Sequence, residues 1–185
     1  ASSADRGSRP RASLVPAVPQ VRPARVRPTS GVEVHPVHTA QAMLAVVDGL
    51  LPVAAAIFAA AVADWRLASA HGQKIKKTSS GDLPILEFAE NPDILARVSA
   101  HDLRPQLVVG FAAETENVID NAAQKRLRKG CDWIVANDVA PQTGIMGGAH
   151  NKVTLIDADG IETWDEMPKS DVARRLALRI ADALT

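Results

Sequence analysis

The chain has 185 residues and a formal net charge of zero, with 46% hydrophobic residues, 3% aromatic residues and no tyrosine. This length suits one domain with a buried core. No apolar run reaches the roughly 18 residues of a membrane span, and the N-terminus lacks the apolar region of a signal peptide. We therefore expect a cytoplasmic protein without a membrane partner. The single cysteine, Cys131, excludes an internal disulfide framework.

The charge is unevenly distributed along the chain. Residues 1–30 hold six of the 21 basic residues, five prolines and one acid, Asp5, which leaves a net charge of −5 on the remainder. This acidic body argues against nucleic-acid binding, which requires a basic face. We expect residues 1–30 to be a disordered or non-native tail. Translation in the wrong frame, a transit peptide and a basic nucleic-acid-binding arm are the alternatives, and residues 31–185 form the predicted domain.

Apolar patterns predict alternating strands and helices from Gly31 onward. The first half of the chain is predicted to hold a strand at Val32 and Val34 that extends at most to Val37, a helix from the Thr39 cap to about Leu50, a buried strand at Val53–Ala63 and an extended segment at Leu83–Phe88. A helix with Asn91 as N-cap and Pro92 as first residue follows, then a strand at Leu107–Ala112, a helix at Asn117–Lys129 closed by Gly130, and a strand at Asp132–Ala136. The chain is predicted to end with a hairpin of Val153–Ile156 and Ile161–Trp164 and a helix capped by Ser170. This order predicts an α/β fold with a Rossmann-like, mainly parallel sheet flanked by helices, and a C-terminal hairpin and helix.

Polar side chains follow three of these apolar strands. They are Asp64, Glu114 and the pair Asn137-Asp138. If the strands are parallel, these side chains meet at one edge of the sheet, where open α/β sheets bind ligands. Polar residues after strands are also ordinary loop starts, so this pattern leaves both interpretations open.

Lysines occur at two places that suit an anionic ligand. One group is Lys74–Lys77, in the loop after Asp64, and the other is Lys125 and Lys129, one helical turn apart. Solvated surface lysines are the alternative at both places. The segment Asn91–Asp93 can present helix N-terminal amides to a phosphate or a base, although a simple cap is the favoured interpretation.

The sequence contains no recognisable metal or dinucleotide motif. His35 and His38 lack partnering cysteines or an acidic cluster, so a structural metal site is disfavoured. Cys131 has no neighbouring histidine and is expected to be an inert thiol. No G-x-G-x-x-G opens a helix, and no Walker loop is present.

Six sequence blocks occur together and in order. They are Ala60-Ala-Val-Ala-Asp-Trp-Arg66, Lys74-Ile-Lys-Lys77, Asn91-Pro-Asp-Ile-Leu-Ala96, Gly110-Phe-Ala-Ala-Glu-Thr115, Lys125-Arg-Leu-Arg-Lys129 and Ile134-Val-Ala-Asn-Asp-Val139. This set resembles phosphopantothenate–cysteine ligase, the CTP-dependent phosphopantothenoylcysteine synthetase of coenzyme A biosynthesis. In bacteria this ligase is usually the C-terminal domain behind a flavin-dependent decarboxylase. The resemblance runs from about Gly31 to the C-terminus.

The resemblance implies a ligase reaction with an acyl-cytidylate intermediate. The carboxylate of 4'-phosphopantothenate attacks the α-phosphate of CTP and expels pyrophosphate, and the amine of L-cysteine then displaces CMP. Such transfers depend on charge neutralisation and positioning. The resemblance further implies magnesium bound with CTP, without an assigned protein ligand, and a homodimer in which the loop after the lysines takes part. FMN would belong only to a fused or associated decarboxylase domain that is not in this chain.

The resemblance also assigns roles to individual residues. The implied catalytic positions are Lys74, on a mobile loop where it stabilises negative charge as the intermediate forms, and Ala61. The implied CTP contacts are Ala59, Ala60, Asp64, Lys74, Pro92, Asp93, Ile94, Leu95, Phe111, Lys125 and Lys129, with the last two lysines on phosphates.

One part of the family pattern is missing. The family's domain opens with a strand, a glycine-containing loop and a Ser-Asn-x-Ser-Ser-Gly-Lys-Met-Gly segment that supplies an asparagine for the acyl intermediate, and residues 1–30 do not match it. We therefore expect an N-terminally incomplete domain that lacks a catalytic group and a central strand. The alternative function is a catalytically incomplete nucleotide-binding or oligomerisation module. A nicotinamide or flavin enzyme is disfavoured by the absent glycine fingerprint.

Overall fold

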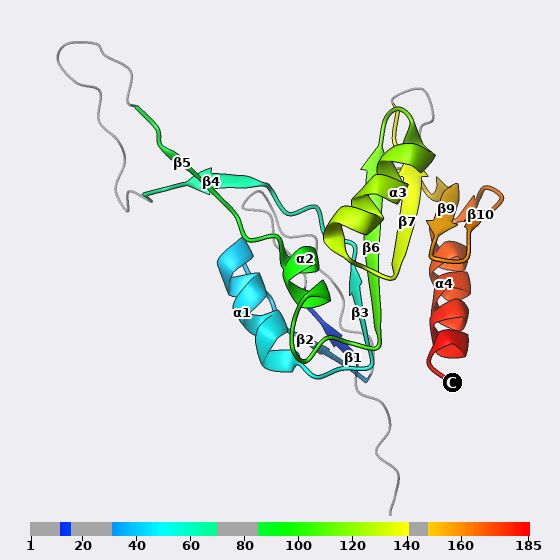
Figure 1. Ribbon diagram of the computed structural model, residues 1–185, viewed down its shortest axis with the longest axis horizontal. Coiled ribbons are helices and arrows are strands. Elements are labelled where there is room, and N and C mark those ends of the chain that lie inside the picture. The colour runs from blue at the N-terminus through cyan, green and yellow to red at the C-terminus, as the bar shows by residue number, and fades with distance from the viewer. Residues whose placement is uncertain (1–11, 16–30, 70–84, 141–147) are drawn as a thin grey trace, which may run out of the picture.

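The computed structural model describes residues 12–15, 31–69, 85–140 and 148–185 (Figure 1). Its centre is a five-stranded mixed sheet in the order β10-β9-β7-β6-β3. The strands are β3 (Ala55–Phe58), β6 (Leu107–Glu114), β7 (Trp133–Asp138), β9 (Val153–Ile156) and β10 (Ile161–Thr163). Strands β3, β6 and β7 run parallel, and β9 and β10 form the antiparallel hairpin. The predicted α/β fold with a parallel core and a closing hairpin is confirmed.

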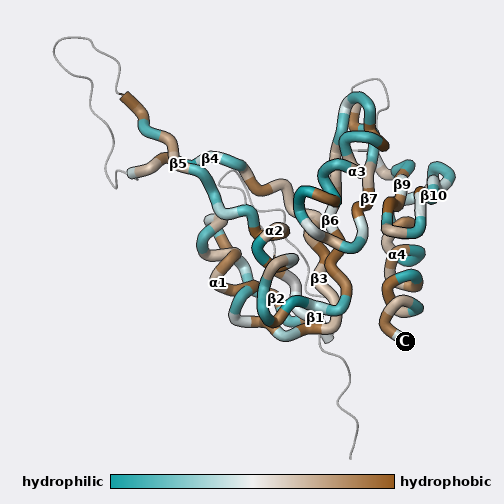
Figure 2. Tube along the Cα trace, viewed as in Figure 1, coloured by the Kyte–Doolittle hydropathy of each residue, from teal (hydrophilic) through white to brown (hydrophobic). Residues whose placement is uncertain are grey.

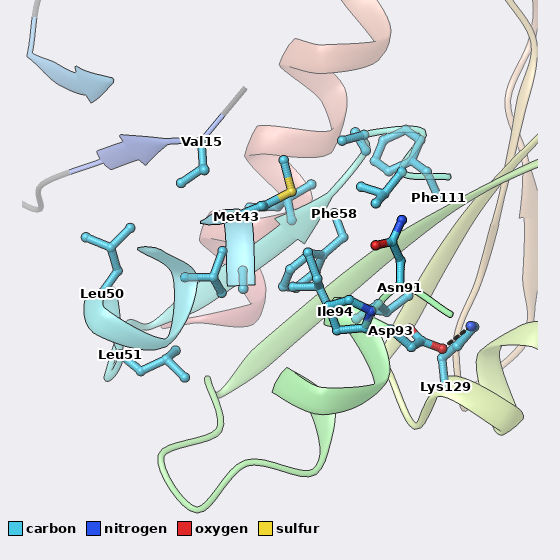
Figure 3. Close-up of a pocket in the computed structure, with 18 of the residues that line it drawn as sticks. Val15, Met43, Leu50, Leu51, Phe58, Asn91, Asp93, Ile94, Phe111 and Lys129 are labelled. Carbon is cyan, nitrogen blue, oxygen red and sulfur yellow. Dashed lines mark hydrogen bonds and ion pairs between the residues drawn. The ribbon is translucent and has the colours of Figure 1, made fainter. Parts of the chain in front are cut away.

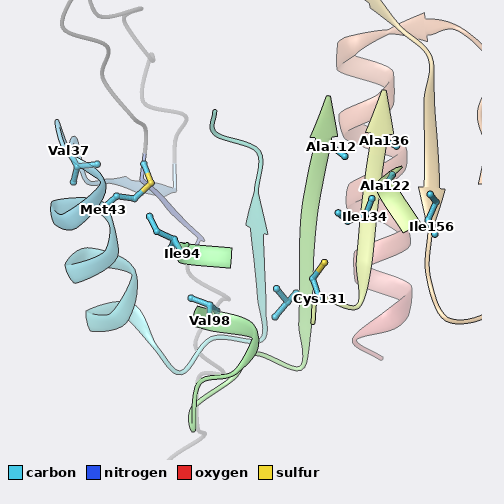
Figure 4. Close-up of a cluster of buried hydrophobic side chains, with 11 residues drawn as sticks. Val37, Met43, Ile94, Val98, Ala112, Ala122, Cys131, Ile134, Ala136 and Ile156 are labelled. Carbon is cyan, nitrogen blue, oxygen red and sulfur yellow. The ribbon is translucent and has the colours of Figure 1, made fainter. Parts of the chain in front are cut away.

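Helices cover both faces of this sheet. In the described ranges these helices are α1 (Ala40–Leu50), α2 (Ile94–Ser99), α3 (Val118–Lys129) and α4 (Lys169–Ala183). Residues of α1, α2 and α3 share one buried cluster with Val108 and Ile134 of the sheet (Figure 4). The residues next in sequence, Val109 and Val135, point to the other face and pack with α4 in a second cluster. Burial on both faces explains why these strands are continuously apolar rather than alternating.

The helix ends follow local capping chemistry in most places. The Thr39 hydroxyl accepts a hydrogen bond from Ala42 N at 3.1 Å and begins α1 as predicted. Gly130 closes α3 in the left-handed region, with φ of 67°. The prediction of Ser170 as the cap of α4 is wrong, because this helix already begins at Lys169 and has Pro168 at its N-cap.

A separate two-stranded parallel sheet lies beside α1. It consists of β1 (Ala12–Leu14) and β2 (Val32–Val34). Strand β2 confirms the strand predicted at Val32 and Val34. Strand β1 lies within residues 1–30, where the sequence indicated no regular element, and the domain boundary at residue 30 remains a prediction.

Two antiparallel pairs complete the described structure. Strands β4 (Trp65–Leu67) and β5 (Phe88–Glu90) form an arm that extends away from the body (Figures 1 and 2), and β8 (His150–Asn151) pairs with β11 (Met167–Pro168). The extended segment predicted at Leu83–Phe88 is misplaced. Its strand is Phe88–Glu90 instead, and residues 83–84 lie outside the described part of the chain.

The strand predicted at Val53–Ala63 is too long. Strand β3 spans only Ala55–Phe58, which pair with Leu107 to Gly110, whereas β6 itself continues to Glu114. Residues 59–64 then leave the sheet and approach the segment before α2. Among the described residues, no helix combines the length and apolar character needed to cross a membrane.

Candidate functional site

A pocket of about 830 Å³ lies beside β3 (Figure 3). One half is apolar and is lined by β1, α1 and the start of β3. The other half is polar and is lined by residues 59–64, residues 90–95 and α3. The lining residues of the polar half are Ala59, Ala60, Val62, Ala63, Asp64, Glu90, Asn91, Pro92, Asp93, Ile94, Leu95, Phe111, Lys125 and Lys129. The polar half therefore combines the lysine side chains of α3 with alanines whose small side chains let a ligand approach the backbone.

Asn91 fastens the two segments that form the rim of the polar half. Its side-chain amide donates a hydrogen bond to Ala63 O at 2.8 Å, and its backbone N–H donates to Asp64 O at 2.7 Å. The predictions of Asn91 as the N-cap of α2 and of Pro92 as its first residue are therefore wrong, since the side chain of Asn91 is engaged with the loop and the helix begins at Ile94. Asp93 takes the cap position, where its Oδ1 accepts from Ala96 N at 3.1 Å.

The two lysines of α3 each lie beside a carboxylate. Lys125 Nζ is 3.9 Å from Glu114 Oε1, at the carboxyl end of β6. Lys129 Nζ contacts Asp93 Oδ2, so the two Asp93 oxygens serve different partners, the helix cap and the lysine. Because both lysines are only partly exposed, at 28% and 21%, their charges are less screened by water than those of surface lysines.

A glycine brings α2 close to β6 behind the pocket. A Cβ at Gly110 would lie 2.7 Å from Leu95 Cδ2, well inside van der Waals contact. The absent side chain therefore lets Leu95 reach the pocket wall next to Phe111. This role of Gly110 was not predicted from the sequence, although a glycine within an apolar strand is a signal of close approach.

The pocket gathers most of the residues predicted for nucleotide contact. Those that line it are Ala59, Ala60, Asp64, Pro92, Asp93, Ile94, Leu95, Phe111, Lys125 and Lys129. Ala61 lies between two lining residues but does not line the pocket itself. Lys74, with Lys76 and Lys77, lies outside the described residues.

The expected meeting of strand-end side chains is only partly observed. Glu114 and Asp138 are register partners at the ends of β6 and β7. Asp64 lines the pocket, whereas Glu114 reaches it only through Lys125, and Asn137 and Asp138 are not among the lining residues. The reason is that residues 59–64 carry Asp64 well past the end of β3.

The remaining candidate groups lie apart from this pocket. Within the described ranges, no group of three His, Cys, Asp or Glu side chains is arranged to hold a metal ion. His35 Nε2 lies 3.4 Å from Glu33 Oε1. Cys131 is buried, and this burial raises the pKa of its thiol above the ordinary value of 9.0. A protonated, buried thiol is a poor nucleophile, in agreement with the inert role predicted for it.

Comparison with known proteins identifies a family for the chain. Residues 14–184 match the model of the DNA/pantothenate metabolism flavoprotein C-terminal domain. The chain is 48% identical over 103 residues to the Coenzyme A biosynthesis bifunctional protein CoaBC of Escherichia coli (strain K12). That match covers 55% of this chain and 25% of CoaBC, so it spans about a quarter of the relative's length.

Solved structures share the fold. The crystal structure of the C-terminal domain of CoaBC has a TM-score of 0.69 and 30% identity, and the match covers 91% of this chain and 71% of that one. A Cab2 mutant in complex with phosphopantothenate-cysteine has a TM-score of 0.59 and 19% identity, covering 83% of this chain and 54% of the other. At that identity the second likeness shows the fold alone.

Proposed function

Because the chain belongs to the DNA/pantothenate metabolism flavoprotein C-terminal domain family, we propose that it carries the ligase step of coenzyme A biosynthesis. The step is the CTP-dependent joining of 4'-phosphopantothenate to L-cysteine. The observation that most supports it is the convergence of ten of the eleven implied CTP contacts, from separate parts of the sequence, on one pocket.

The polar half of the pocket suits a triphosphate. Lys125 and Lys129 are one helical turn apart, so their ammonium groups can bind successive phosphates along the helix. At present each lysine has a carboxylate partner, Glu114 or Asp93. Phosphate oxygens would replace those carboxylates or bind the same ammonium groups beside them, because an ammonium group carries three donors. The lysines thereby neutralise the charge that otherwise opposes attack on the α-phosphate.

The proposed reaction has two balanced steps. A carboxylate oxygen of 4'-phosphopantothenate attacks the α-phosphorus of CTP, and the bond to pyrophosphate breaks. The cysteine amine then attacks the acyl carbon, CMP leaves with the bonding electrons, and the amine loses a proton. We propose that Lys74 and the backbone around Ala61 stabilise charge in these steps.

Magnesium would enter this site with the nucleotide. Asp64, Glu90 and Asp93 supply carboxylates to the pocket, which are ligand types that magnesium accepts. They are not grouped closely enough in the described structure to form a metal site of their own. We therefore assign most of the ion's coordination to the phosphate oxygens and water.

Pyrophosphate release tests the proposal. The parent chain, given CTP, magnesium, 4'-phosphopantothenate and cysteine, should release pyrophosphate only when 4'-phosphopantothenate is present. Lys74→Gln and Lys129→Gln should lower this rate by at least about tenfold, the effect of losing one charge-assisted contact. Arg128→Gln is the matched control, since Arg128 is exposed on the same helix and does not line the pocket.

The outcomes separate the two candidate functions. Release that does not depend on 4'-phosphopantothenate, or that survives both lysine substitutions, would contradict the ligase assignment at this pocket. CTP binding without any release would instead support a nucleotide-binding module without catalytic activity.

We also propose that the chain forms a homodimer through the β4–β5 arm. Trp65 and Phe88 on this arm are 62% and 63% exposed, and Ile85, three residues before β5, is 94% exposed. A two-stranded ribbon with exposed apolar side chains is marginal by itself, and a second copy would cover it. Sedimentation should therefore give a dimer for the parent and a monomer for the double variant Trp65→Ser/Phe88→Ser. A parent that stays monomeric at high concentration would contradict this assignment.

A further inference from the structure

The two lysine–carboxylate pairs beside the pocket are not equivalent. Lys129 Nζ contacts Asp93 Oδ2, and both residues line the pocket (Figure 3). Lys125 Nζ lies 3.9 Å from Glu114 Oε1, and of these two residues only the lysine lines the pocket. The Asp93 side chain is 43% exposed and that of Glu114 is 22% exposed. A ligand that binds Lys129 therefore meets the carboxylate of Asp93, whereas a ligand that binds Lys125 reaches Glu114 only through the lysine.

Asp93 is held in place while its second oxygen faces Lys129. Its Oδ1 accepts a hydrogen bond from Ala96 N at 3.1 Å and caps α2. The helix behind this cap is anchored in the core by Ile94 and Val98, which are 6% and 0% exposed. Moving the carboxylate away from Lys129 would break the cap, so we expect it to stay beside the lysine when a ligand occupies the pocket.

A phosphate bound to Lys129 would place a second anion next to Asp93. Because both anions would share one ammonium group, the carboxylate and the phosphate oxygens would lie close to each other, where like charges repel. A divalent cation removes this repulsion, since carboxylate and phosphate oxygens are both ligands of magnesium. Asp93 therefore opposes a bare polyphosphate and favours one that brings its own cation.

Asp93 is better placed for this role than the other carboxylates of the pocket. Asp64 and Glu90 also line the pocket. Among the ion pairs of the described residues, none joins either of them to Lys125 or Lys129. Their carboxylates therefore do not mark the position of a phosphate as that of Asp93 does.

We propose that Asp93 makes the pocket selective for a nucleoside triphosphate that carries a divalent cation over the free triphosphate. Its Oδ1 keeps the cap of α2, and its Oδ2 contacts the cation in place of Lys129, whose ammonium group then binds the phosphate. The inference rests on the proposed function, because it requires the phosphates of the nucleotide to lie at Lys129. It adds the chemical form of the nucleotide that the pocket accepts and the residue that selects this form.

Calorimetry with CTP, in excess magnesium and in EDTA, measures this selectivity. The quantity compared is the ratio of the dissociation constant in EDTA to that in magnesium. We expect a ratio of at least about ten for the parent, since one unfavourable charge contact changes affinity by about that factor. Asp93→Asn keeps an oxygen for the cap but removes the charge. Its ratio should be at least about fivefold lower, mainly because CTP in EDTA binds more tightly.

Glu114→Gln is the matched control, because it removes the same charge from the other pair and Glu114 does not line the pocket. Its ratio should equal that of the parent. Asp93→Ser also keeps a capping oxygen and removes the charge, so it takes the place of Asp93→Asn if circular dichroism shows that variant to be unfolded. Lys129→Gln reports whether the phosphates lie where the inference requires, and it should weaken CTP binding in both conditions.

The outcomes distinguish this inference from the proposed function. If the parent does not bind CTP, or if Lys129→Gln does not weaken binding, the proposed site is wrong and the inference falls with it. If CTP binds and Lys129→Gln weakens it, an Asp93→Asn ratio equal to that of the parent overturns the inference alone. An equal fall of the ratio in Glu114→Gln also overturns it, since the effect would then reflect the overall charge of the chain rather than Asp93.

Discussion

Asp93 combines a structural and an electrostatic role in the pocket, and two substitutions separate them. Its Oδ1 caps α2 through Ala96 N, and its Oδ2 contacts Lys129 Nζ. Asp93→Ala removes both interactions. Asp93→Asn keeps an oxygen for the cap, since asparagine caps helices as well as aspartate does, but it removes the charge.

The expected costs follow from these contacts. Loss of an N-cap costs about 1 kcal/mol. The Asp93 side chain is 43% exposed, so its ion pair with Lys129 is screened and contributes about 0.5 kcal/mol. We therefore expect Asp93→Ala to lower the free energy of unfolding by about 1.5 kcal/mol, and Asp93→Asn by about one third of that.

Urea denaturation followed by circular dichroism measures both values. The slope m should stay the same in the parent and in both variants, so that the shift in midpoint reports stability alone. Equal destabilisation by the two variants would refute the division of roles. It would mean that the contact with Lys129, and not the cap, determines the contribution of Asp93.

Two further predictions concern groups outside the pocket. Asp132→Ala should lower the free energy of unfolding by about 2 kcal/mol, because the Asp132 carboxylate accepts hydrogen bonds from the buried Val108 N at 2.7 Å and from Arg104 Nη2 at 2.8 Å. An unchanged urea midpoint in this variant would contradict the prediction. Burial raises the pKa of Cys131, so the folded state holds its proton at a pH where the unfolded state loses it. Stability should therefore fall as the pH rises above the ordinary thiol value of 9.0, and Cys131→Ala should reduce that fall; identical pH profiles of the urea midpoint would show that the thiol contributes nothing.

Much of the fold follows from apolar patterning and capping residues. The continuous apolar runs in β6 and β7 predict strands buried on both faces. In the structure, side chains of both strands belong to the two hydrophobic clusters, one on each face of the sheet. Thr39 and Gly130 mark helix ends because a side-chain acceptor and a left-handed residue are local requirements. These signals depend on few neighbouring residues, so they can be recognised in the sequence without knowledge of the tertiary structure.

The wrong predictions concern strand ends, helix caps and strand pairings that tertiary contacts determine. The apolar run that contains β3 continues beyond it, but residues 59–64 leave the sheet and approach the segment before α2, although β6 continues to Glu114. Asn91 has the right side chain for a cap, yet the neighbouring loop takes its hydrogen bonds. The pairing of β1 with β2 depends on a contact between segments about 20 residues apart, which periodicity does not report.

Many residues that line the pocket were predicted one by one as CTP contacts, but the contacts between them were not predicted, and their role in binding stays a prediction. The family resemblance implied CTP contacts for ten of the residues that line the pocket. The contacts of Lys129 with Asp93 and of Lys125 with Glu114 join residues that are distant in sequence, and only the folded chain reveals them. The same holds for the apolar half of the pocket, which residues of β1, α1 and β3 line and which no local sequence pattern indicates.

Calorimetry of CTP binding in the presence of magnesium tests the central claim most directly. The parent and Arg128→Gln should bind CTP with similar affinity. The double variant Lys125→Gln/Lys129→Gln should bind at least about a hundredfold more weakly, since two charge-assisted contacts are lost. Equal affinity of the double variant and the parent, with both folded, would show that the nucleotide does not bind in this pocket.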